Sequence, residues 1–155
     1  MEDAFEDMLE EVKRAEHLYY VSLKYTRTVD VLRSCMERFI STYEYGFKTL
    51  LLLAKKKKKI KELPESSILQ VKELETLKLF EELRLQKHID LYRKLRKLIR
   101  LPYTKREEYR RHVTMTVETE SGPEEINIDI VGEYFQITFD FLKKVRELIH
   151  PKGNI

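Results

Sequence analysis

The sequence predicts a mainly α-helical protein: an antiparallel bundle of four to five helices with one β-hairpin near the C-terminus. Only 4 Gly and 4 Pro occur in 155 residues, while 37% of the residues are charged, which is typical of long helices. Apolar residues recur every three or four positions over most of the chain, but residues 112–130 alternate apolar and polar. This length fits one domain, so we treat residues 1–155 as a single unit.

The first two predicted helices are the most regular. One covers residues 3–25, and its first turns carry acidic residues, which suit the positive end of the helix dipole. The stretch YTRTVD then interrupts the pattern, and Thr28 is a candidate N-cap for a second helix that begins at Val29 and reaches the lysines. Gly46 lies inside this second helix, where glycine costs about 1 kcal/mol relative to alanine. We therefore expect another helix to approach closely at Gly46.

Two further helices follow. Pro64 ends the second helix, and Ser66 or Ser67 can cap a third helix over residues 68–85. Apolar spacings of three drift around the helix axis, so a bend or break is expected near LQKHID. A fourth helix covers residues 88–100 and stops before Pro102.

The β-hairpin is predicted over residues 112–130, with the turn at ESGPEE. Its two apolar faces are formed by Val113, Met115 and Val117 and by Ile126, Ile128 and Ile130. Because an isolated hairpin is only marginally stable, it has to pack on the helices or pair across a dimer. A last amphipathic helix is predicted over residues 132–149.

Composition also predicts where the protein resides. The single Cys35 cannot form an internal disulfide, which favours a reducing cytoplasm. The acidic N-terminus does not resemble a signal peptide, and the longest apolar run, residues 50–54, is far shorter than a membrane span. We expect a soluble cytoplasmic protein with no membrane partner. High charge with only two Asn and three Gln resembles the composition of thermophilic proteins.

The net charge of +3 is unevenly distributed. Residues 1–20 have a net charge of −5, residues 48–61 carry seven lysines and no acid, and residues 84–111 carry eleven Lys and Arg against three acids. This asymmetry indicates an anionic partner such as RNA or DNA. Two interpretations of the stretch LLLLAKKKKKIKEL are open: a solvated helix end, whose lysines favour the helix dipole, or a phosphate contact surface.

The second basic region, residues 84–111, is the better nucleic-acid candidate because arginines and tyrosines are mixed in it. The alternative is that it forms the polar face of a bundle helix. The residues predicted to bind nucleic acid are Arg93, Arg96, Lys97, Arg100, Lys105, Arg110 and Arg111.

Common enzyme motifs are missing from the sequence. It contains no Gly-rich phosphate loop, CxxC, HExxH or GxSxG, and its four histidines are widely separated. We therefore expect no metal site and no cofactor, and a non-catalytic role is favoured.

Two stretches, ISTYEYGFKTLLLLA and LYRKLRKLIRLPY, resemble helices of the HEPN group of small helical-bundle proteins. This resemblance implies a dimer and, in active members, an RNA-cleaving cleft; other members are partners of nucleotidyltransferases or binding modules. The catalytic pattern is an arginine and a histidine on one helix. Arg96 falls at the place of that arginine, but the residues that follow it, KLIRLPY, contain no histidine. Arg106 and His112 have the required spacing, although they follow Pro102 and His112 opens the predicted hairpin.

Three functional hypotheses follow. The favoured one is a non-catalytic binding or assembly module that contacts nucleic acid through a basic helix face. The alternatives are a metal-independent HEPN-type ribonuclease that uses Arg106 and His112, and a purely protein–protein interaction module. Nine Tyr, seven Phe and the lone hairpin also predict a homodimer.

Overall fold

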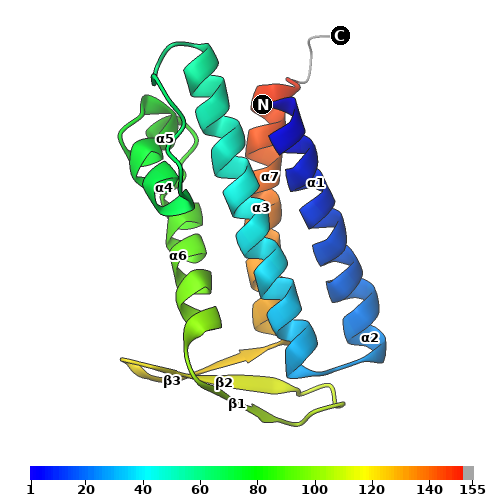
Figure 1. Cartoon of the computed structure of the whole chain (residues 1–155). Coiled ribbons are helices and arrows are strands. Elements are labelled where there is room, and N and C mark those ends of the chain that lie inside the picture. Colours follow the sequence, from blue (N-terminus) through cyan, green and yellow to red (C-terminus); the bar gives the residue numbers. More distant parts are fainter. Residues whose placement is uncertain (152–155) are drawn as a thin grey trace.

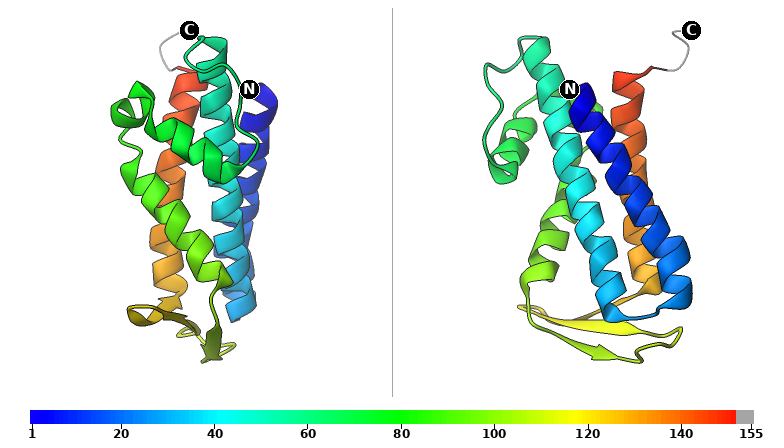
Figure 2. Two further views of the ribbon diagram at one scale, coloured as in Figure 1. Left: turned by 60° about the vertical axis from the view of Figure 1, so that its left-hand side comes forward. Right: turned by 45° about the vertical axis from the view of Figure 1, so that its right-hand side comes forward.

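Four long helices run side by side in the computed structural model, and a three-stranded sheet lies across one end of them (Figures 1 and 2). The structure describes residues 1–151. Consecutive long helices run in opposite directions, and α3 contacts all three others. This arrangement confirms the prediction of a mainly helical chain. The long helices are α1 (Glu2–His17), α3 (Val29–Lys56), α6 (Gln86–Arg100) and α7 (Ile128–Ile149).

The first predicted helix is divided. After α1 the chain makes a π-helical turn, η1 (Leu18–Ser22), and a short helix, α2 (Leu23–Tyr25). A π-turn contains one more residue per turn than an α-helix and so rotates the side chains that follow it. The predicted N-cap of α3 is confirmed, since the Thr28 hydroxyl accepts a hydrogen bond from the Val31 amide at 3.3 Å.

The third predicted helix is two short helices, α4 (Ser67–Glu75) and α5 (Lys78–Glu82). Ser66 caps α4, accepting from the Leu69 amide at 3.2 Å. The break expected near LQKHID is present, because α5 ends before Leu83 and α6 begins at Gln86. The additional break follows Glu75, where the Thr76 hydroxyl bonds the Glu73 carbonyl oxygen at 2.7 Å and competes with the helical pattern.

The sheet differs from the predicted hairpin in its number of strands and in where the strands end. Its strands are β1 (Tyr103–Arg106), β2 (Thr114–Thr119) and β3 (Gly122–Asn127), all antiparallel in the order β1-β2-β3, so one strand was not predicted. The turn is also shorter than predicted, since residues 122–125 of ESGPEE belong to β3. The prediction was also wrong in placing Ile128 and Ile130 on a strand, since both belong to the first turn of α7. Asn127 ends the strand because its side chain caps α7, accepting from the Ile130 amide at 2.9 Å.

One face of the sheet is buried against the helices, which supply its packing partner within the chain. The buried apolar residues of this face are Met115, Val117 and Ile126, together with Val113 just before β2. Arg33 of α3 fixes this junction: Nη2 donates to the Ile99 carbonyl oxygen at 3.0 Å, and the guanidinium lies 4.3 Å from the centre of the Tyr103 ring.

The close approach expected at Gly46 is confirmed. A Cβ atom there would collide with the Phe141 ring of α7 and with the end of the Met8 side chain of α1. Aromatic side chains fill the space around this contact, and the largest fully buried ones are Tyr43, Tyr92, Phe39, Phe47 and Phe141. Within residues 1–151, none of the helices has both the length and the apolar character that crossing a membrane requires.

Candidate nucleic-acid interface

The basic side chains of α6 are placed by the amphipathic pattern of this helix. Leu91, Leu95 and Leu98 are buried on one side. The helical period therefore puts the intervening Arg and Lys residues on the other side, at the surface. Four of the seven residues predicted to bind nucleic acid lie together here: Arg93, Arg96, Lys97 and Arg100.

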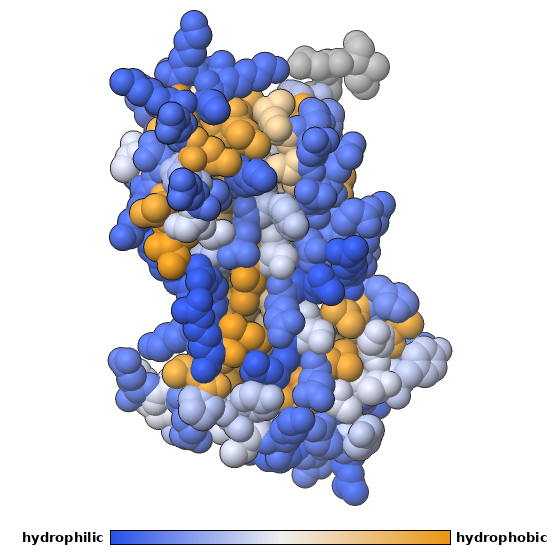
Figure 3. Space-filling model, viewed as in Figure 1, coloured by the Kyte–Doolittle hydropathy of each residue, from blue (hydrophilic) through white to orange (hydrophobic). Residues whose placement is uncertain are grey.

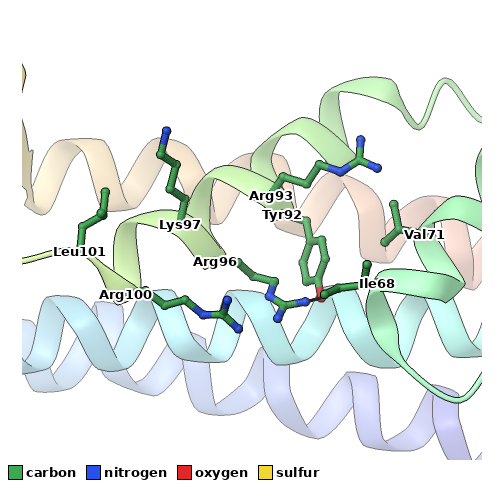
Figure 4. Close-up of a pocket in the computed structure, with 8 residues that line it drawn as sticks. All are labelled: Ile68, Val71, Tyr92, Arg93, Arg96, Lys97, Arg100 and Leu101. Carbon is green, nitrogen blue, oxygen red and sulfur yellow. Dashed lines mark hydrogen bonds between the residues drawn. The ribbon is translucent and has the colours of Figure 1, made fainter. Parts of the chain in front are cut away.

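These four residues line a hollow of about 430 Å³ whose floor is apolar. Ile68 and Val71 of α4, Tyr92 of α6 and Leu101 complete the lining. In the view of Figure 4, Arg96 and Arg100 extend from α6 toward α3, while Arg93 and Lys97 extend away from α3. The hollow thus combines a cationic edge with an apolar base.

Tyr92 anchors one of these arginines. Its hydroxyl donates to Glu44 Oε2 at 2.7 Å and accepts from Arg96 Nη1 at 3.1 Å. Burial, together with the hydrogen bond to the Glu44 carboxylate, raises the pKa of Tyr92 to about 12. The phenol therefore stays protonated at neutral pH, and it holds Arg96 without neutralising its charge.

Some of the cationic side chains of α6 form ion pairs with carboxylates, but not all of them do. Arg93 Nη2 lies 2.8 Å from Glu75 Oε1, and Lys94 Nζ lies 2.7 Å from Glu124 Oε1. Within residues 1–151, no carboxylate forms an ion pair with Arg96, Lys97 or Arg100. The Glu44 carboxylate reaches Arg96 only through the Tyr92 hydroxyl. The cations of this region without a direct carboxylate partner are therefore concentrated on the last turns of α6.

The other three predicted residues lie elsewhere, on β1 and in the β1–β2 loop. Lys105 Nζ pairs with Asp30 Oδ1 at 3.1 Å, and Arg111 Nη2 pairs with Asp129 Oδ1 at 3.1 Å. Arg110 is exposed. The predicted binding set is thus divided between α6 and the sheet, because β1 carries the chain away from the helix after Pro102.

The two residues of the ribonuclease hypothesis, Arg106 and His112, line one hollow of about 460 Å³. Arg106 belongs to β1, whereas His112 lies in the loop just before β2, so the pair does not share a helix. The Arg106 guanidinium is also paired with Glu125, at 2.8 Å.

The lysine run lies at the C-terminal end of α3. Lys55 to Lys59 are all exposed, and within residues 1–151 none of these five forms an ion pair. The chain leaves the helix at Lys58, whose φ is +60°, and returns to the core at Ile60, which is buried.

A buried histidine was missed by the sequence reasoning. His88 is fully buried, with Nδ1 3.0 Å from the Tyr43 hydroxyl and Nε2 3.1 Å from Asp140 Oδ2. Burial and the nearby Lys144 ammonium lower the pKa of His88 to about 4. The histidine is therefore neutral at pH 7: Nε2–H donates to the carboxylate and Nδ1 accepts from the phenol. The three residues come from three helices, and no spacing in the sequence connects them.

Cys35 and the acidic side chains offer little further chemistry. Burial raises the pKa of the Cys35 thiol to about 12, which makes it unreactive at neutral pH. Among residues 1–151, no three His, Cys, Asp or Glu side chains gather closely enough to hold a metal ion.

Comparison with known proteins gives no match: no family model, curated protein or solved structure is significantly similar to this chain. The resemblance to the HEPN group accordingly stays a prediction.

Proposed function

We propose that this protein is a non-catalytic binding module that contacts nucleic acid through α6. The observation that carries the proposal is the group formed by Arg96, Lys97 and Arg100, which we call the α6 cation group. It occupies the last turns of one helix, lines one hollow and, within residues 1–151, lacks carboxylate partners. Like charges four residues apart disfavour a helix by about 0.2–0.5 kcal/mol, and bound phosphates would remove that repulsion.

The chemistry of this face supports backbone contacts more than base contacts. Within residues 1–151, Tyr92 is the only aromatic residue that lines the hollow, and its ring is buried, so the hollow offers no exposed ring on which a base could stack. Arginine forms paired hydrogen bonds with phosphate oxygens, and such contacts position a nucleic acid without reading its sequence. We therefore expect strong salt dependence and little sequence preference.

The lining of the hollow supports a binding role over a catalytic one. Among the residues that the structure describes, the lining includes no carboxylate, histidine, cysteine or hydroxyl group other than the Tyr92 phenol. That phenol has a raised pKa and is already engaged with Glu44 and Arg96. General acid–base chemistry needs a group whose pKa lies near the working pH, and this hollow does not supply one.

The test is a comparison of two triple variants in fluorescence anisotropy with labelled RNA and duplex DNA. Arg96→Gln/Lys97→Gln/Arg100→Gln removes three charges from α6, and Lys55→Gln/Lys56→Gln/Lys57→Gln removes three from the exposed lysine run. We expect the α6 variant to lose affinity and the lysine variant to bind nearly as wild type does. Equal affinity of the α6 variant and the wild type would reject the assignment. If the wild-type protein binds neither nucleic acid even at about 50 mM salt, the purely protein-binding role is the hypothesis that remains.

A metal-independent ribonuclease is the second candidate, favoured by the single hollow that Arg106 and His112 share. It predicts cleavage of RNA in the presence of a chelator, lost in both Arg106→Ala and His112→Ala. A denaturing gel of the RNA from the binding experiment measures this directly. Intact RNA, or equal cleavage by both variants and the wild type, would remove these roles.

A further inference from the structure

Three tyrosines are exposed at the end of the molecule where α2 meets the β1–β2 loop. Tyr20, Tyr25 and Tyr109 have 56%, 79% and 77% of their surfaces exposed. In Figure 3, pale and orange side chains gather over α2, at the lower right. Exposed aromatic rings that gather at one place on a surface mark an interaction site more often than rings exposed singly. We call this surface the tyrosine end.

The backbone holds these rings outward. The π-turn η1 includes Tyr20, whose ring packs edge-on against the Tyr19 and Phe135 rings with centroids 5.1 and 5.8 Å apart. Tyr109 has a φ of +66°, which is uncommon for a non-glycine residue, and its amide donates to the Arg27 carbonyl oxygen at 2.6 Å. The β1–β2 loop is thereby attached to the α2–α3 connection, which brings Tyr109 close to the segment that carries Tyr25 (Figure 1).

Cations lie among the rings. Lys24, Arg27 and Arg111 line a hollow of about 210 Å³ together with Tyr20. The Arg27 Nε–H is buried and, within residues 1–151, has no hydrogen-bond acceptor. Of the acids nearby, Asp129 pairs with Arg111, and Glu108 accepts from the Val29 amide at 3.0 Å. Glu107 is exposed. Within residues 1–151, Lys24 and Arg27 form no ion pair, whereas the charge of Arg111 is shared with Asp129. The tyrosine end therefore has positive charge beside exposed rings.

We propose that the tyrosine end binds single-stranded nucleic acid, with unpaired bases stacked on Tyr20, Tyr25 and Tyr109 and the phosphates held by Lys24, Arg27 and Arg111. Exposed aromatic rings interleaved with cations are the arrangement that single strands require, because every base offers a flat face. In a duplex those faces are covered by neighbouring base pairs, so the rings select single strands. This inference rests on the proposed function: the α6 cation group holds any backbone, and the tyrosine end adds the preference for unpaired bases.

The experiment compares Tyr25→Ala/Tyr109→Ala with Tyr25→Phe/Tyr109→Phe. Both positions are exposed and neither hydroxyl makes a hydrogen bond within residues 1–151, so the variants differ in the presence of a ring. Anisotropy is measured with labelled oligouridine of about 12 nucleotides and with duplex DNA of the same length. We expect the Ala variant to lose about 5- to 150-fold in affinity for oligouridine per ring, with duplex binding unchanged, and the Phe variant to bind as the wild type does.

The outcomes separate this inference from the proposed function. Unchanged binding of oligouridine by the Ala variant overturns the tyrosine end while leaving the α6 assignment in place. The inference is also overturned if the Ala variant loses as much affinity for the duplex as for oligouridine. It is overturned as well if the Ala and Phe variants lose the same affinity for oligouridine, because neither pattern reflects base stacking. If the Ala variant loses affinity for oligouridine while the α6 triple variant binds oligouridine as the wild type does, the role of the tyrosine end is supported and that of the α6 cation group is rejected. A wild-type protein that binds neither probe rejects both.

Discussion

His88 links helices through hydrogen bonds that the sequence does not predict. The neutral ring joins Tyr43 to Asp140, and Lys87 Nζ lies 3.2 Å from the same Asp140 oxygen. Burial alone would raise the pKa of Asp140, but the hydrogen bond from Lys87 and the charges of Lys87 and Lys144 lower it. The carboxylate thus stays ionised as the acceptor of the His88 proton. The sequence predicts each of the three helices involved, yet the residues are separated by 45 and 52 positions.

The depressed pKa of His88 predicts how stability depends on pH. In the unfolded chain His88 takes up a proton below about pH 6.5, whereas in the folded protein it does so only below about pH 4. The unfolded state therefore binds more protons between these values, so the free energy of unfolding falls as pH decreases through this window, by on the order of 3 kcal/mol. Urea unfolding at several pH values between 4 and 7 measures this loss.

Two variants identify the histidine responsible. His88→Gln should abolish most of the pH dependence in that window, while His17→Gln, which changes an exposed histidine, should keep it. A pH dependence that is the same in His88→Gln as in the wild type would contradict the buried, neutral state of His88.

At the scale of elements, the sequence predicts helix starts better than changes of secondary structure. Thr28 and Ser66 are short polar residues before apolar periodic stretches, and both cap as expected. The alternation INIDI is compatible with a strand, but the Asn127 side chain converts its second half into the start of α7. Strand β1 has weak apolar alternation, and it forms because β2 offers it an edge to pair with. Such pairing depends on tertiary contacts that local patterns do not contain.

The C-terminal end of α3 provides a prediction at this scale. The Lys59 amide bonds the Ala54 carbonyl oxygen at 2.8 Å and the Lys58 amide bonds that of Lys55 at 3.0 Å, the pattern of a Schellman motif. Lys58 occupies the left-handed position that glycine favours, with φ +60°. Lys58→Gly should raise the free energy of unfolding by about 1 kcal/mol, because glycine adopts this conformation without steric cost. Urea denaturation measures the difference.

The neighbouring lysine is the matched control. Lys57 has a φ of −85°, so Lys57→Gly removes the same charge without relieving a left-handed backbone. It should leave stability unchanged or lower it. Equal stabilisation by both substitutions would show that the charge, rather than the backbone, is responsible.

For the whole molecule, the mainly helical character and the basic regions could be predicted from composition and periodicity, but the grouping of the charges could not. Lys105 and Arg111 are near α6 in sequence, yet β1 and its loop place them beside Asp30 and Asp129. The sheet also removes one of the two arguments for a homodimer, because its apolar face is covered by the helices of the same chain. The homodimer stays a prediction that rests on the aromatic content.

The salt dependence of nucleic-acid binding by the α6 triple variant tests whether Arg96, Lys97 and Arg100 contact phosphates. Each phosphate contact adds about 0.7–0.9 to the slope of log affinity against log salt. Losing three contacts should make the slope shallower by about 2–3, which removes about 20- to 40-fold of the affinity change between about 50 and 200 mM salt. We predict this shallower slope for Arg96→Gln/Lys97→Gln/Arg100→Gln and a wild-type slope for Lys55→Gln/Lys56→Gln/Lys57→Gln. A wild-type slope in the α6 variant, or a shallower slope in the lysine variant alone, would contradict it.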